Sequence, residues 1–132
     1  MRIAVALTLL LLLGLLPAAA AELRLAADIP FPFVVNGKTL PAGEYEVFPV
    51  LQSALAIREV QTFASAMMLV NREPDRTYRA PVLVFNTRDN TNSLTTITAD
   101  GESFLLLRPK TERTRFAGSG NNETRVILAR RK

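Results

Sequence analysis

The chain has 132 residues and a formal net charge of +4 at pH 7, from 16 Lys and Arg against 12 Asp and Glu. It contains no His, Cys or Trp. These absences exclude Ser-His-Asp and Cys-His nucleophilic systems, zinc sites built on His or Cys, haem ligation by these residues, and disulfides. We therefore expect no cofactor and no metal site, and only carboxylates remain for general acid–base chemistry.

The first 21 residues have the three parts of a secretory signal peptide. A positive charge near the amino terminus is followed by an apolar stretch at residues 3–16 and a run of alanines at residues 18–21. The small side chains predict cleavage between Ala21 and Glu22. A retained membrane anchor is the alternative, but residues 3–21 approach the roughly 20 apolar residues of a span only by including a proline and four alanines. The pattern therefore predicts an exported chain, either periplasmic or secreted.

Residues 22–132 are predicted to form a single β-rich domain, because short β-prone runs alternate with turn residues. Residues 23–29 and 31–35 are the first two predicted strands. Prolines surround the start of the second, which favours an edge or the beginning of a strand. Asn36-Gly37 then predicts a tight hairpin turn, and the sequence LPAG at residues 40–43 predicts another turn.

The middle of the chain shows the two-residue period of half-buried strands. In residues 44–50, Tyr45 and Val47 are predicted to point to the core. Glu44 and Glu46 are predicted to point away from it. Residues 54–60 have a similar pattern. Residues 63–70 are more apolar and predict a central strand with both methionines in the core, a short helix being the alternative. Residues 71–79 are predicted to be a charged loop.

The last third continues the β pattern. Residues 81–86 are rich in β-branched and aromatic residues and predict a buried strand. A threonine-rich strand at residues 93–99 leads through Asp100-Gly101, a hairpin signal, into a strand at residues 102–107. Residues 125–129 are the last predicted strand. The fold class is therefore all-β, as a small antiparallel sandwich or partly open barrel of about seven to nine short strands.

Charge is distributed unevenly along the mature chain. Residues 22–107 carry seven positive and ten negative charges, whereas residues 108–132 carry eight positive and two negative ones. One hypothesis for this basic C-terminal segment is weak, salt-sensitive contact with anionic envelope lipid or polysaccharide. It predicts no specific binding of nucleic acid. The interpretation that we favour for this segment is a solvated tail that only increases solubility. The candidate anion-binding residues are Arg108, Lys110, Arg113, Arg115, Arg125, Arg130, Arg131 and Lys132.

Two carboxylates are candidates for a catalytic pair. Glu44 and Glu46 lie two residues apart, so a strand would point both toward one substrate. The alternative is a pair of solvated charges on the outer face of the strand, and we assign no catalytic residue.

The segment at residues 28–47, DIPFPFVVNGKTLPAGEYEV, resembles one found in small exported β-rich proteins of uncharacterised function that are abundant in acidobacteria. The shared pattern is I-P-F-x-F-x-V-x-G-K-x-L-P-A-G-x-Y-x-V, which begins here at Ile29 and ends at Val47. The resemblance implies a β-rich envelope or secreted domain and implies no activity. From residue 108 onward the family pattern is not present.

These observations predict an exported binding or structural module without catalytic activity. A periplasmic carrier of a small apolar ligand is the second hypothesis. A hydrolase that uses carboxylates alone is the third and least favoured.

Overall fold

The computed structural model describes residues 23–108 and 122–132, which contain eleven β-strands and no helix. The all-β prediction is therefore confirmed, and the predicted signal peptide lies outside the described residues. The strands are β1 (Leu25–Ile29), β2 (Phe33–Val35), β3 (Lys38–Leu40), β4 (Gly43–Leu51), β5 (Ala54–Glu59), β6 (Ser65–Pro74), β7 (Val82–Arg88), β8 (Thr91–Ala99), β9 (Glu102–Leu106), β10 (Glu123–Leu128) and β11 (Arg130–Arg131).

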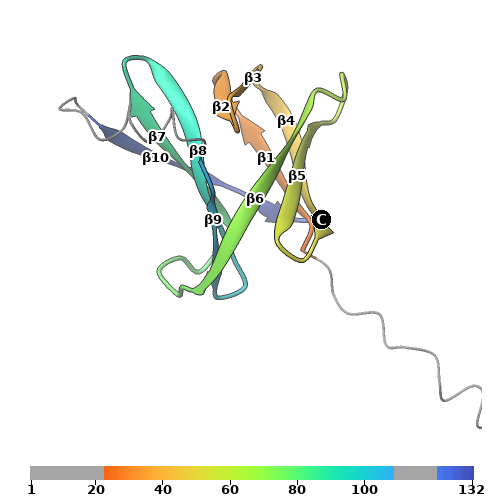
Figure 1. The fold of residues 1–132 in the computed structure, drawn as a ribbon, viewed down its shortest axis with the longest axis vertical. Helices are drawn as coiled ribbons and strands as arrows, with labels where there is room; N and C mark the ends of the chain where they lie inside the picture. Colours follow the sequence, from red (N-terminus) through yellow and green to blue (C-terminus); the bar gives the residue numbers. More distant parts are fainter. Residues whose placement is uncertain (1–22, 109–121) are drawn as a thin grey trace, which may run out of the picture.

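The strands form two groups that share β6 (Figure 1). The first group follows the order β11-β1-β4-β5-β6, and the second follows β6-β9-β8-β7-β10. The first half of β6 pairs with β5 up to Leu69, and its second half pairs with β9 from Val70 onward. One long strand thus belongs to both groups, as expected where a sandwich or partly open barrel turns a corner.

The C-terminal strands connect the two groups a second time. β10 pairs with β7 of the second group, whereas β11 pairs with β1 of the first. Only Ala129 separates β10 from β11, so the two ends of the strand order are formed by one short piece of chain. The prediction of a single strand at residues 125–129 missed this division. The short β3 and β11 raise the number of strands above the seven to nine predicted.

Two predictions about β6 were wrong. Residues 71–74, predicted as part of a loop, continue the strand and pair with β9, with Arg72 stacked 5.0 Å from the centre of the Phe104 ring. Both faces of this stretch are exposed, so it lacks the alternation that marks a half-buried strand. Met68 is buried as predicted, but Met67 is 53% exposed, because adjacent strand residues point to opposite faces.

The two predicted hairpin turns are confirmed by their backbone angles. Asn36 and Gly37 have φ values of 50° and 77°, and Asp100 and Gly101 have φ values of 56° and 76°. Positive φ at both central residues is typical of the type I′ turn, whose twist matches that of the strands it joins.

The core lies between the two strand groups and centres on aromatic rings. Phe33 on β2 makes edge-to-face contacts with Tyr45 on β4 and with Phe85 on β7, at centroid distances of 5.0 and 5.5 Å. Phe31 packs against Phe85 in the same way, at 5.0 Å. The strand alternation predicted Tyr45 in the core, and its ring is fully buried.

Replacing Phe85 with alanine should lower the free energy of unfolding by about 3–5 kcal/mol, because it removes a buried ring that contacts two others. Val126→Ala, a change on the exposed β10, should cost less than about 0.5 kcal/mol. Urea unfolding of both variants measures the difference. Equal losses would show that the ring cluster does not hold the two strand groups together.

Candidate functional site

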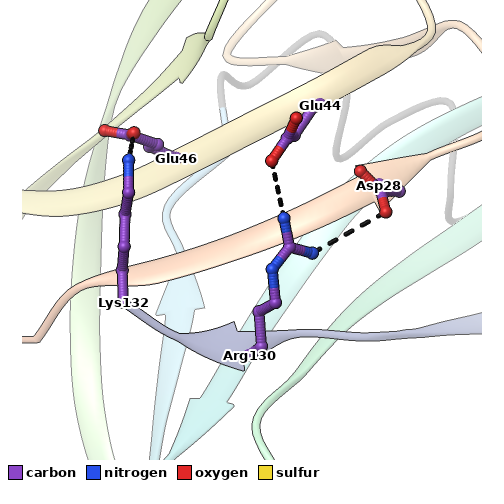
Figure 2. Close-up of polar contacts among 5 residues, drawn as sticks. All are labelled: Asp28, Glu44, Glu46, Arg130 and Lys132. Carbon is purple, nitrogen blue, oxygen red and sulfur yellow. Dashed lines mark hydrogen bonds and ion pairs between the residues drawn. The ribbon is translucent and has the colours of Figure 1, made fainter.

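Three cations at the end of the predicted basic segment contact carboxylates of the same chain. Figure 2 shows Arg130 between two of them: its Nη2 lies 2.6 Å from Glu44 Oε1, and its Nη1 lies 3.7 Å from Asp28 Oδ2. Lys132 forms an ion pair with Glu46 in the same view. Arg131 pairs with Asp100. These contacts are called the C-terminal ion pairs below.

Strand register explains why these charges meet. Residue 28 lies opposite residue 44 and residue 26 opposite residue 46 in the β1–β4 pair, so the carboxylates share the face turned away from the core. β11 adds to the other edge of β1 with Arg130 opposite Ala26. Glu44 and Glu46, the candidate catalytic pair, therefore both bind cations of the chain itself.

The other candidate anion-binding residues have different surroundings. The Arg125 guanidinium lies 5.3 Å from the centre of the Phe31 ring, within the range of a cation–π contact. Arg108 follows β9 at the end of the first described range. Lys110, Arg113 and Arg115 lie outside the described residues, so the structure does not place them.

A surface groove of about 490 Å³ lies where β4, β5 and β6 meet the β2–β3 hairpin. Five apolar, two neutral polar and two cationic residues line it, without a carboxylate among them: Val35, Asn36, Lys38, Phe48, Ala56, Arg58, Ser65, Ala66 and Met67. Its volume lies within the range of roughly 300–1,000 Å³ that small-molecule sites occupy. We call this feature the β6 groove.

The hollow follows from side-chain size along one row of the sheet. Phe48, Ala56 and Met67 lie opposite one another on β4, β5 and β6. Opposed residues point to the same face, which here is the face opposite to buried Val47 and Ile57. Because Ala56 is much smaller than its two neighbours, the row is low in the middle.

Cations and rings border this row. The Arg58 guanidinium lies 5.2 Å from the centre of the Phe48 ring and 5.6 Å from that of the Phe63 ring. Arg24 lies 5.8 Å from the centre of the Phe48 ring. The nearest carboxylate contact of Arg58 is a long one, 3.9 Å to Glu46 Oε2. The groove therefore presents positive charge beside apolar surface.

The turn between β5 and β6 holds Phe63 in an unusual backbone conformation. Its φ is 61°, a region that aromatic residues rarely adopt, yet its ring is 65% exposed. The nearby Glu59 carboxylate accepts hydrogen bonds from the backbone N–H groups of Gln61 and Thr62 and from the Thr62 hydroxyl. These bonds fix the turn and so the position of the ring.

The same hydrogen bonds alter the acidity of Glu59, which is only 6% exposed. The Thr62 hydroxyl, and then the backbone N–H of Thr62, stabilise the charged carboxylate and lower its pKa, although burial opposes the change. Burial, followed by the charge of Glu59, raises the pKa of Tyr45. The Tyr45 hydroxyl donates a hydrogen bond of 2.5 Å to the carbonyl of Pro41.

Residues 23–108 and 122–132 contain no group of three or more His, Cys, Asp or Glu placed to hold a metal ion. Over the same residues there is no helix long and apolar enough to cross a membrane. No protein-family model matches the chain, and comparison with curated proteins and with solved structures finds no match.

Sequence reasoning did not identify the β6 groove. Its residues come from five strands and a turn, and their grouping depends on how those strands pair. The alternation in residues 44–50 and 54–60 showed only that some side chains face outward. It did not show which of them would be neighbours.

The C-terminal ion pairs predict a salt-dependent part of the stability. Replacing Arg130 and Lys132 with glutamine should lower the free energy of unfolding at low salt by about 0.2–1 kcal/mol for each pair lost, since every pair has at least one exposed partner. Near 1 M NaCl the loss should shrink, since exposed charges are then screened over about 3 Å. Urea unfolding at the two salt concentrations measures it. Arg79→Gln, at an exposed cation outside these pairs, is the control, and an equal effect there would contradict the assignment.

Glu59→Gln should make stability less dependent on acid. A carboxylate whose pKa is lowered by folding contributes stability above its unfolded pKa, about 4.3, and loses it as pH falls through the folded pKa. The melting temperature of the native chain should thus exceed that of the variant near pH 7, and the gap should close below about pH 4. Glu73→Gln, on an exposed part of β6, is the control. A gap that stays constant from pH 7 to pH 3 would contradict the role of Glu59.

Proposed function

We propose that the mature chain is a non-catalytic binding module of the bacterial envelope or exterior, and that it contacts its partner through the β6 groove. The observation that carries this proposal is the composition of the groove, where Phe48 and Met67 lie beside Lys38 and Arg58. Aromatic side chains, Met and Arg are enriched where proteins bind partners.

The distribution of ion pairs supports the choice of this surface. Arg130, Arg131 and Lys132 each contact carboxylates of the chain, which lowers their capacity to attract an external anion. At the groove, Lys38 bonds to a backbone carbonyl, and the ion pair of Arg58 with Glu46 is a long one. We therefore place the main anion-attracting surface at the groove rather than at Arg130, Arg131 and Lys132.

The second candidate, a carrier of a small apolar ligand, has one observation in its favour, the groove volume of about 490 Å³. Such a ligand would occupy the surface groove rather than the space between the strand groups. That space is occupied by buried side chains such as Phe33, Tyr45 and Phe85.

The signal-peptide pattern and the resemblance of residues 28–47 support the proposed location. An envelope partner would be an anionic lipid, a polysaccharide or a protein. The β6 groove suits an anionic partner that also carries apolar groups.

Co-sedimentation of the purified mature chain with bacterial cell envelopes tests the proposal. Wild-type protein should sediment with the envelopes, and Met67→Glu should reduce the bound fraction about tenfold, because it places a negative charge in a cationic, apolar groove. Leu128→Glu is the matched control, since Leu128 is 72% exposed on β10, away from the groove.

Mass spectrometry of the exported chain should give Glu22 as its first residue.

Equal sedimentation of the wild type and both glutamate variants would exclude the groove as the contact surface. Glutamine replacements of Arg130 and Lys132 test the basic segment separately. Deleting residues 108–132 would not serve, because the deletion removes β10 and β11. A loss of binding confined to these glutamine variants would return the contact surface to the C-terminal segment.

A further inference from the structure

One edge of β6 has no strand partner over part of its length. On the β5 side, hydrogen bonds run from Glu59 N to Ala64 O at 2.8 Å and from Val70 N to Ser53 O at 2.9 Å. Bonded pairs in an antiparallel ladder recur at every second residue. The N–H and C=O groups of Ser65 and Met67 therefore point away from β5.

Pairing with β9 does not reach these groups. The β6–β9 pair begins at Val70, and one further backbone bond joins Leu107 N to Leu69 O at 2.9 Å. Within residues 23–108 and 122–132, no strand pairs with Ser65 or Met67 on that side. This stretch is called the free edge below.

Side chains of the β2–β3 hairpin cover the carbonyls of the free edge. Lys38 Nζ donates a hydrogen bond of 2.7 Å to Ser65 O, and Asn36 Nδ2 donates one of 3.4 Å to Met67 O. A backbone N–H of an added strand would make the same kind of bond to each carbonyl. It would also bring a carbonyl for the N–H groups of the edge, which the Lys38 ammonium group, a donor only, cannot supply.

The free edge forms one side of the β6 groove, and the covering hairpin forms the other. Val35, Asn36 and Lys38 line the groove on the hairpin side, and Ser65 and Met67 line it on the β6 side. An extended segment laid along the edge would therefore lie in the groove. Its alternate side chains would lie beside Met67, at the β6 end of the row that also contains Ala56.

The positive charge of the groove favours an extended segment that carries acidic side chains. Two cations, Lys38 and Arg58, line the groove, and no acidic residue does. An added strand that releases Lys38 from Ser65 O leaves its ammonium group free to pair with a carboxylate. An acidic side chain on the segment would supply that partner in place of the lost bond.

We propose that the free edge of β6 binds an extended, acidic segment of a partner polypeptide as an additional β-strand. Main-chain hydrogen bonds to Ser65 and Met67 hold the segment, Lys38 pairs with its Asp or Glu side chain, and an apolar side chain packs at Met67. This is recognition by β-augmentation, in which main-chain bonds give affinity and side-chain pockets give specificity. The inference rests on the proposed function and names the chemistry of the partner.

Fluorescence anisotropy with labelled peptides and the mature protein tests it. The probe is the heptapeptide Thr-Val-Glu-Val-Thr-Val-Thr, capped at both ends. A version with lysine in place of glutamate should bind about tenfold more weakly at low salt, because it faces Lys38 and Arg58. A version with N-methyl groups at alternate residues cannot donate the main-chain bonds and should not bind measurably.

Two substitutions at one position separate the edge from its side chain. Met67→Pro removes an N–H group that points away from β5, and proline is tolerated on edges of this kind. It should abolish binding of the glutamate peptide, whereas Met67→Ala, which keeps the N–H, should retain most of it. Circular dichroism and the melting temperature establish that both variants are folded. Lys38→Gln should weaken the preference for glutamate over lysine in the peptide, with Arg58 accounting for what remains.

Each alternative occupant has its own result. Equal binding of the N-methylated and unmodified peptides, or no binding of any peptide, would overturn strand addition. If Met67→Glu still reduced envelope binding in that case, the proposed function would stand without strand addition. A dimer in light scattering that Met67→Pro dissociates would show that a second copy of the chain occupies the edge, which also overturns the proposal.

Discussion

The fold depends on one aromatic contact, the Phe33 ring between Tyr45 and Phe85. Tyr45 belongs to the first strand group and Phe85 to the second, so the ring joins them at the centre of the core. Without disulfides, this burial must hold the groups together along with the chain crossings at β6 and at β10–β11. It also fixes the position of the β2–β3 hairpin, because Phe33 begins β2. The hairpin in turn determines where Asn36 and Lys38 meet β6.

The segment at residues 28–47 concentrates these constraints. Gly37 supplies the positive φ of the hairpin turn, and Leu40 is buried at the end of β3. Pro41 offers the carbonyl that Tyr45 binds. A side chain at Gly43 would approach Glu59 Cγ to 3.1 Å, so the Glu59 side chain, whose carboxylate holds the turn after β5, would have to shift. Most of this pattern therefore specifies the fold, while Lys38 also borders the groove.

Most of the strands were predictable because they are half-buried. Burial on one face leaves an alternating pattern, and Asn36-Gly37 and Asp100-Gly101 carry turn chemistry that is local to two residues. The prediction failed where that pattern is missing, at residues 71–74, whose exposed side chains do not distinguish a strand from a loop. The ion pair between Arg130 and Glu44 could not be predicted from the sequence for another reason. It joins residues 86 apart in the chain, and only the pairing of β11 with β1 brings them together.

The candidate site shows the same limit for function. Net charge along the sequence offered residues 108–132 as a candidate anion-binding segment, but charge counts do not show which cations carboxylates of the chain neutralise. The negative body and the positive C-terminal strands are complementary, and β11 places their charges on one face. The charges of Arg130 and Lys132 therefore act within the molecule and help to hold the last strand on β1. Lys38 and Arg58 lie within the net-negative part of the sequence, where composition gives no sign of a cationic surface. Lys38 and Arg58 form a cationic surface because no carboxylate lies among the residues that line the groove with them.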